Sequence, residues 1–162
     1  MGSPLEADAG LALPELGFRV ARRRYADLSG EGARLVGGRW NSPGRAVLYL
    51  AESAALAVLE VLVHLDLDET TMPDDYVIMS VDFSALKASP GWLENGPPVA
   101  PSDAECRAIG DAFLAAKRAL ALRLPSVIVP RASNYVLDPA HPLMAQVTIK
   151  STDPFVFDRR LL

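Results

Sequence analysis

A carboxylate within an apolar helix, and a glycine-rich turn before it, are the features of this sequence that could carry chemistry. Glu60 falls inside Ala54–Leu65, a stretch that is otherwise apolar almost throughout and predicts a buried helix of about 12 residues. At about 3.6 residues per turn, Glu60 shares a face with Leu56 and His64. A carboxylate there costs several kcal/mol unless a cation pairs with it or a reaction uses it. Glu60 is therefore either half of a buried ion pair or a catalytic group facing a developing positive charge.

The turn before this helix, Gly37–Gly44, contains three glycines and a proline, so its backbone can approach a ligand closely. Arg39 lies in this turn, and Arg19 lies in the first predicted strand. A guanidinium group binds carboxylates and phosphates through paired hydrogen bonds. The two arginines are therefore candidates for binding a diphosphate, and the other interpretation of Arg39 is a structural partner for a carboxylate.

Five further side chains each have a functional and a structural interpretation. Tyr49, on a short apolar strand, either packs in the core or offers its ring or hydroxyl to a ligand. Trp40 either stacks on a base or fills the core. The Ser126 hydroxyl either binds a ligand or caps its own backbone. Asn134 and His141 lie in a turn-rich stretch, where loop hydrogen bonding is the alternative to a functional role.

Composition and charge predict one ordinary globular domain. Of 162 residues, 50% are hydrophobic and 22% are charged. We expect residues 15–162 to form this domain and residues 1–14 to form a partly disordered tail. The net charge of −4 argues against nucleic acid as the main ligand, because phosphate binding favours a positive surface. The run Arg22–Arg24 is a local exception that could serve one phosphorylated ligand.

Several common chemistries lack their sequence signature. The single cysteine, Cys106, cannot form an internal disulfide, and no Cys/His group has zinc-ligand spacing, so no metal is expected. There is no GxGxxG after a strand, no Walker A lysine, no HExxH and no GxSxG. The N-terminus lacks a signal pattern, and no apolar run reaches about 18 residues, so we expect a cytoplasmic protein.

The order of predicted elements indicates an α+β fold, with mixed or antiparallel strands and no regular βαβ repeat. The expected strands are Leu16–Ala21, Val47–Leu50, Tyr76–Phe83, Pro125–Pro130, Gln146–Ile149 and Pro154–Phe157. Ser102 and Glu105 form a capping box that opens a second helix, ending near Leu122 and turning Asp111 outward. The expected loops include Arg22–Leu35 and Arg131–Pro142.

The segment GGRWNSPGRAVLYLAESAALAVLEVLVHL resembles the core of RES-domain toxins, which are named for an Arg, a Glu and a Ser. The later segments PSVIVP and SNYVLDPAHP follow in the same order, and the resemblance runs from Phe18 to Phe157. By this resemblance the family residues fall on Arg39, Glu60 and Ser126, with Ser133 as the alternative serine, and on Tyr49, Arg19 and Asn134.

The resemblance implies a fold similar to that of ADP-ribosyltransferase toxins such as diphtheria toxin, and NAD as the substrate. It also implies an Xre-type helical antitoxin that blocks the site and carries the DNA-binding activity of the complex. Arg39 and Arg19 would hold the diphosphate, Tyr49 the nicotinamide end, and Ser126 and Asn134 the ribose or the amide. Glu60 would stabilise the oxocarbenium-like ribose.

Three functions remain open. The chain hydrolyses or phosphorolyses NAD, or it transfers ADP-ribose to a protein, or it is a non-catalytic binding module in which Glu60 and the arginines form a buried network. Val58 stands two residues before Glu60, where many transferases have a second acidic residue. The absence of an acidic residue at this position favours a non-protein acceptor or an unusual transferase. No metal is required in either reaction.

Overall fold

The computed structural model describes residues 12–65 and 72–161, and within them one mixed sheet has the strand order β4-β5-β6-β2-β1-β3-β7. β4 and β5 are parallel, and the other neighbouring strands are antiparallel. The strands are β1 (Leu16–Arg22), β2 (Leu48–Ala51), β3 (Tyr76–Asp82), β4 (Leu93–Asn95), β5 (Ala121–Pro125), β6 (Ser133–Leu137) and β7 (Thr148–Phe155). The predicted α+β fold with mixed strands is therefore confirmed.

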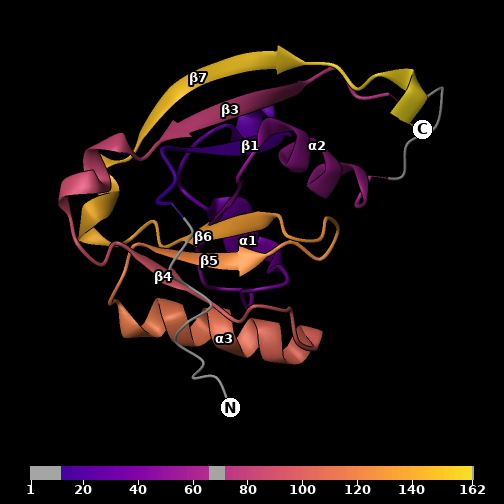
Figure 1. Ribbon diagram of the computed structural model, residues 1–162. Helices are drawn as coiled ribbons and strands as arrows, with labels where there is room; N and C mark the ends of the chain where they lie inside the picture. Colours follow the sequence, from indigo (N-terminus) through magenta and orange to yellow (C-terminus); the bar gives the residue numbers. More distant parts are fainter. Residues whose placement is uncertain (1–11, 66–71, 162) are drawn as a thin grey trace.

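The sheet opens in its middle. β1 and β2 pair at a single position, Phe18 with Ala51, whereas β1 pairs with β3 over seven positions. Figure 1 shows the consequence: β1, β3 and β7 form an upper layer, and β4, β5 and β6 form a lower one. The candidate site lies at this place, because residues of both β1 and β2 line a pocket there.

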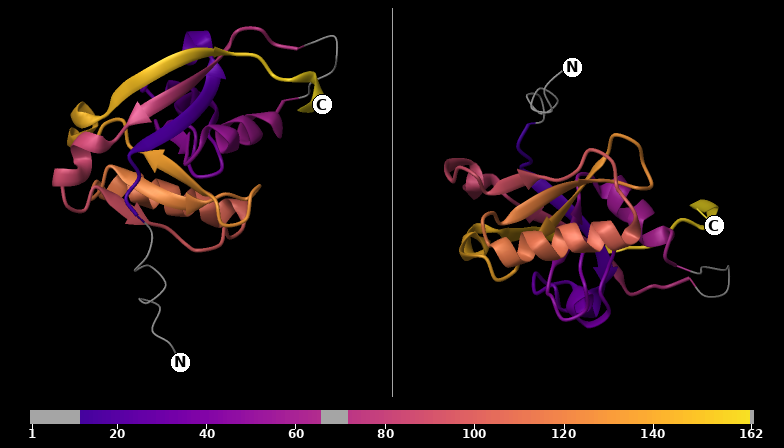
Figure 2. Two further views of the ribbon diagram at one scale, coloured as in Figure 1. Left: turned by 45° about the horizontal axis from the view of Figure 1, so that its top comes forward. Right: turned by 90° about the horizontal axis from the view of Figure 1, so that it is seen from below.

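Three α-helices in the described residues flank this opening: α1 (Glu31–Val36), α2 (Ala54–Leu62) and α3 (Asp103–Ala116). α2 packs against β1 and β2, and α3 lies across the outer face of the β4–β6 half, as the view from below shows (Figures 1 and 2). Short 3-10 helices span Arg23–Tyr25, Ser84–Ala88, Pro142–Gln146 and Arg159–Leu161.

α2 begins as predicted but is less buried than its composition suggests. The Ser53 hydroxyl accepts the Leu56 N–H at 3.1 Å and caps the helix. Leu56 and Ala57 are its buried residues, while Leu59 is 37% exposed. The prediction of a fully buried helix ending at Leu65 is therefore wrong. One face covers β1 and β2, and another borders the opening of the sheet.

α3 starts at the predicted capping box, with Ser102 and Glu105 bonded reciprocally. It ends at Ala116, because Lys117 adopts a left-handed conformation with φ 55°. The prediction that the helix continues to Leu122 is wrong, since Ala121 and Leu122 belong to β5, the strand between β4 and β6. Pairing on both sides overrides the helical propensity of this segment.

Three other predictions of local structure also need correction. Pro125–Pro130 was expected to be a strand, but β5 ends at Pro125 and the following residues form a loop. The loops expected over Arg131–Pro142 and Arg22–Leu35 contain β6 and α1. The two final strands are one continuous strand, β7. Most of the predicted tail, residues 1–11, lies outside the described residues.

The core lies on both sides of the sheet. One cluster, with Trp40, Cys106 and Phe113, fills the space between α3 and the sheet. Another, with Leu56, Tyr76 and Phe157, lies beneath α2. Burial raises the pKa of the Cys106 thiol, which supports its interpretation as a structural residue. No helix in the described part of the chain is both long and apolar enough to cross a bilayer.

Candidate functional site

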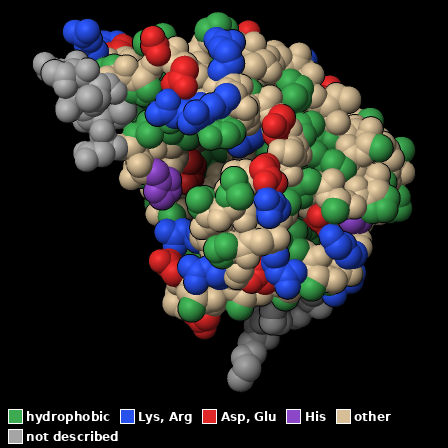
Figure 3. Space-filling view, turned by 180° about the vertical axis from the view of Figure 1, so that it is seen from behind, with side chains coloured by type: hydrophobic (Ala, Val, Ile, Leu, Met, Phe, Trp, Pro, Cys, Tyr) green, Lys and Arg blue, Asp and Glu red, His purple; other side chains and the backbone are tan. Residues whose placement is uncertain are grey.

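A pocket of about 860 Å³ occupies the opening of the sheet. Strands β1, β2 and β6, helices α1, α2 and α3, and the turn after α1 contribute to its wall. The space-filling view from behind shows a hollow in this face with a histidine at its edge (Figure 3), and His64 is among the residues that line the pocket. A cavity of this size can enclose a ligand the size of a dinucleotide.

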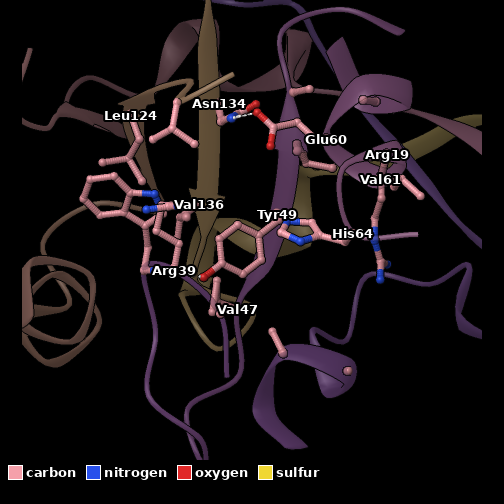
Figure 4. Close-up of a pocket in the computed structure, with 18 of the residues that line it drawn as sticks. Arg19, Arg39, Val47, Tyr49, Glu60, Val61, His64, Leu124, Asn134 and Val136 are labelled. Carbon is pink, nitrogen blue, oxygen red and sulfur yellow. Dashed lines mark hydrogen bonds between the residues drawn. The ribbon is translucent and has the colours of Figure 1, made fainter. Parts of the chain in front are cut away.

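Glu60 projects from α2 into this pocket (Figure 4) and is half-buried. Its Oε1 atom accepts a hydrogen bond from Nδ2 of Asn134 at 2.6 Å and one from Oγ of Ser126 at 3.0 Å. Among the described residues, no cation forms a salt bridge with it: Arg39 pairs with Asp103, and Arg45 with Asp111. The buried ion pair that the sequence left open is therefore not formed between these residues.

Ser126 acts behind the carboxylate rather than in the cavity. It is not part of the pocket wall. Its hydroxyl oxygen accepts the N–H groups of Ile128 and Val129, both at 3.1 Å, while it donates to Glu60. The hydroxyl thus caps the loop after β5 and fixes the orientation of the carboxylate. Ser133, the alternative family serine, lies at the start of β6.

Asn134 lies on β6, between Ala51 of β2 and Leu124 of β5, and its side chain lines the pocket. Its Nδ2 atom holds Glu60. Its Oδ1 atom is buried and has no hydrogen-bond partner among the described residues. An acceptor left in this state costs about 1–3 kcal/mol, so the site gains when a ligand or a water donates to it.

Tyr49 packs against the core cluster that contains Trp40 and Val47, and it also borders the pocket. Its ring lines the pocket from β2. Its hydroxyl accepts the Trp40 N–H at 3.0 Å and donates to Oδ1 of Asn41 at 2.7 Å. Burial raises the pKa of Tyr49 to about 12, so the phenol stays neutral under ordinary conditions. A Cβ atom at Gly38 would lie 2.7 Å from this hydroxyl, which explains a glycine at this position.

The turn that carries Arg39, residues 37–42, is held by residues that sequence reasoning did not identify as functional. Asn41 is fully buried and donates to the carbonyls of Ala33, Ser42 and Arg45. Asp111 accepts the backbone N–H and the hydroxyl of Ser42, so the prediction that it turns outward is wrong. Nothing in the sequence marks the pair of Asp111 and Ser42, because helix α3 and the turn meet only in the folded chain.

The cationic side chains lie at different parts of the pocket wall. Nη1 of Arg19 donates to the carbonyls of Tyr25 and Asp27, and burial lowers the pKa of its guanidinium. Arg39 is exposed and bonds Asp103 at 2.5 Å. Figure 4 shows Arg19 and Arg39 on opposite sides of Tyr49. Arg107 of α3 also lines the pocket and was not singled out in the sequence.

The remaining candidates have structural surroundings. Trp40 is buried in the core, although its edge reaches the pocket wall. Nδ1 of His141 accepts the Leu143 N–H and caps a 3-10 helix away from the pocket. In the run Arg22–Arg24, Arg22 pairs with Asp75 and the other two are exposed. No group of three potential metal-ligating side chains occurs within residues 12–65 and 72–161.

Comparisons with known proteins agree with the residues on which the resemblance was based. Residues 17–158 match the RES domain. Toxin Res of Pseudomonas putida is 38% identical over 144 residues, covering 85% of this chain and 94% of that protein. A protein of Sphingobium sp. named Prs ADP-ribosylating toxin is 36% identical over 145 residues, covering 84% of this chain and 87% of that protein.

A solved structure shares the fold. The toxin in the crystal structure of the Mycobacterium tuberculosis MbcT–MbcA toxin–antitoxin complex aligns with a TM-score of 0.65 at 20% identity, covering 88% of this chain and 85% of the matched one. The match to the RES domain spans most of the chain, and the similar sequences are named toxins. The chain therefore belongs to the RES-domain family and is a toxin of the RES type.

Proposed function

We propose that this toxin consumes NAD by cleaving the bond between nicotinamide and ribose, and that the loss of NAD arrests growth. The observation that carries this proposal is the environment of Glu60. Its carboxylate lines a pocket large enough for a dinucleotide, two hydrogen bonds fix one oxygen, and no described cation neutralises it. A fixed negative charge of this kind stabilises a positive charge that develops in the transition state.

The chemistry fits the leaving group. Nicotinamide carries a positive charge on its ring nitrogen in NAD and leaves as a neutral molecule with the electron pair of the C1′–N bond. The ribose left behind acquires oxocarbenium character, which Glu60 stabilises or whose hydroxyls it binds. The acceptor oxygen then bonds C1′ and releases its proton. Within the described residues no hydrogen bond reaches Oε2 of Glu60, so this oxygen is available to the sugar.

The other site residues would bind and orient the dinucleotide. Arg39 would contact the diphosphate, and its exposed pair with Asp103 is worth at most about 1 kcal/mol, so a phosphate readily replaces it. Arg19 would supply a further cation to the dinucleotide from its remaining N–H groups, on the other side of Tyr49 from Arg39. Asn134 would bind the ribose or the nicotinamide amide through Oδ1, and Tyr49 would pack its ring on the nicotinamide end. Ser126 would act through Glu60.

The ADP-ribose could pass to either of two classes of acceptor, a small molecule (water or phosphate) or a protein. Hydrolysis or phosphorolysis is favoured by Val58, because no second acidic residue stands two positions before Glu60. Transfer of ADP-ribose to a protein is favoured by the name of the Sphingobium relative, an ADP-ribosylating toxin. Incubation of the toxin with adenine-labelled NAD and cell extract separates them. Free labelled ADP-ribose or its phosphate indicates a small acceptor, and labelled protein bands indicate transfer.

The partner would be an antitoxin of the Xre type that covers the pocket, represses transcription through its own DNA-binding domain and works with the toxin in the cytoplasm. The similar solved toxin is part of a toxin–antitoxin complex. Exposed apolar side chains border the pocket here: Val36 is 80%, Val63 56% and Val127 48% exposed. These exposed apolar side chains at the pocket are where the proposed antitoxin would make contact. Val36→Asp should weaken the complex, as measured by calorimetry.

The experiment that tests the function measures NAD with purified toxin, free of antitoxin. The proposal predicts loss of NAD and release of nicotinamide. NAD that binds without any turnover, with every acceptor class supplied, would instead support the binding-module alternative. Growth arrest on expression of the toxin alone, relieved by the antitoxin, tests the role in cells.

A further inference from the structure

Helix α3 presents one face to the candidate site. Arg107 lies four residues after Asp103, and Gly110 and Asp111 lie three and four residues after Arg107, which is the spacing of neighbours along one side of an α-helix. Asp103 bonds Arg39, and Asp111 bonds Ser42. A Cβ atom at Gly110 would lie 1.6 Å from the carbonyl oxygen of Trp40. These contacts hold the turn that presents Arg39 against this face of α3.

Arg107 is the basic residue among these four, and none of the contacts described above involves it. It lies one helical turn after Asp103, the partner of Arg39, and both arginines line the pocket. Its side chain is exposed, lines the pocket, and forms no salt bridge with any described residue. Both Arg107 and Arg39 also lie close enough to Tyr49 to lower the pKa of its hydroxyl, against the larger effect of burial.

Arg19 is less suited to share one diphosphate with Arg39. It lies on the opposite side of Tyr49 (Figure 4), and Nη1 is already bonded to two carbonyls. A diphosphate carries two neighbouring charges and is bound best by two cations on the same side. Of the arginines in the pocket wall, Arg107 meets this requirement beside Arg39.

We propose that Arg107 and Arg39 together form the diphosphate-binding subsite of this pocket, with α3 as its support. The proposal rests on the function argued above, because it assigns one part of the same dinucleotide. Arg107 then binds substrate without taking part in bond cleavage. Removing it should raise the KM for NAD and leave kcat nearly unchanged.

A binding experiment without turnover tests this directly. The probes are ADP, which carries the diphosphate, and adenosine, which does not. Arg107→Ala in the full chain should weaken ADP binding roughly tenfold or more, the usual effect of losing a charge-assisted hydrogen bond, and leave adenosine binding unchanged. Arg118→Ala is the matched control, because Arg118 is also exposed, follows α3, and pairs with Glu94 outside the pocket wall. Arg107→Lys should restore part of the ADP affinity.

Two results would overturn the assignment: ADP affinity that does not change in Arg107→Ala, or ADP and adenosine affinities that fall by the same factor. The second would mean that Arg107 supports the structure rather than the diphosphate. The outcome is separable from the proposed function. ADP binding that depends on Arg107, in a protein that never consumes NAD, would reject the reaction and keep the subsite.

Discussion

Asn134 holds Oε1 of Glu60 at 2.6 Å across the opening between β6 and α2. The two residues are 74 positions apart in the sequence, and the bond between them links the lower half of the sheet to the helix that covers the upper half. The same oxygen accepts the Ser126 hydroxyl, so two neutral donors rather than a cation fix the carboxylate. Among the described residues no cation pairs with Glu60, so its carboxylate can act on a positive charge that develops in the pocket.

The serine of the site is tested by paired alanine variants. Ser126→Ala removes the bond to Glu60 and leaves the N–H groups of Ile128 and Val129 without their acceptor. We expect a loss of about 1–2 kcal/mol in unfolding free energy and a kcat roughly tenfold lower, since Asn134 still holds the carboxylate.

Ser133→Ala is the control for this variant. The described residues give the Ser133 side chain no hydrogen bond, and we expect wild-type stability and turnover. Urea unfolding and initial rates of NAD loss check both variants. Activity lost in Ser133→Ala and kept in Ser126→Ala would reverse the assignment of the family serine.

Local signals predicted much of the site. The Ser53 cap, the apolar run that contains Glu60 and the glycine-rich turn lie within one segment, so their elements were predicted nearly correctly. The carboxylate was recognised because its surroundings in the sequence were apolar. What the sequence could not provide was its actual partners, which come from β6 and from the loop after β5.

The errors arise where tertiary contacts override local preference. Leu120 and Leu122 continue the apolar period of α3, yet they lie beyond Lys117, whose left-handed backbone ends the helix without a glycine to mark it. Ala121–Pro125 is a strand because β4 and β6 flank it. The roles of Asp111 and Arg107 depend on how α3 packs against the turn, which no short segment encodes. Asn41 bonds residues of the segment 33–49, which come together only when this segment folds.

The Tyr49 hydroxyl gives a pH-dependent contribution to stability. Its pKa in the folded protein is about 12, against an ordinary value of 10.0, because burial disfavours the phenolate. The folded state then holds the proton more tightly, so this contribution is complete below pH 10 and is lost as the pH rises from about 10 to about 12. Chemical unfolding at pH 8 to 11.5 should show a decline that is smaller in Tyr49→Phe.

At neutral pH, Tyr49→Phe should also loosen the turn that presents Arg39, because the Trp40 N–H and Asn41 lose their partner. We expect a loss of about 1–2 kcal/mol and a higher KM for NAD. An identical pH dependence in the two proteins would contradict the buried, neutral phenol.

A substitution at Gly110 tests the contact between α3 and the turn that carries Arg39, residues 37–42. Gly110→Ala places a Cβ atom where the Trp40 carbonyl now lies, and the backbone must move. We expect a loss of about 3 kcal/mol, the upper end of the range for overpacking, together with a higher KM for NAD in the molecules that remain folded. Thermal unfolding and steady-state kinetics provide the two readouts.

Ala112→Gly is the matched control on the same helix. Ala112 is exposed, so the change weakens α3 by about 1 kcal/mol through helix propensity and does not crowd the turn. Its KM should equal that of the wild type. If Gly110→Ala binds NAD as the wild type does, α3 does not position the turn.

The most direct test of the account is the rate of NAD loss in Glu60→Gln, measured with purified toxin free of antitoxin. The glutamine keeps the shape and the acceptor oxygen for Asn134 and Ser126 but removes the charge, so we predict a melting temperature close to that of the wild type and a rate lower by about 100-fold or more. Glu52→Gln, at an exposed glutamate after β2 that is not in the pocket wall, should retain full activity. Wild-type rates in Glu60→Gln at equal stability would contradict the role of this carboxylate in cleaving NAD.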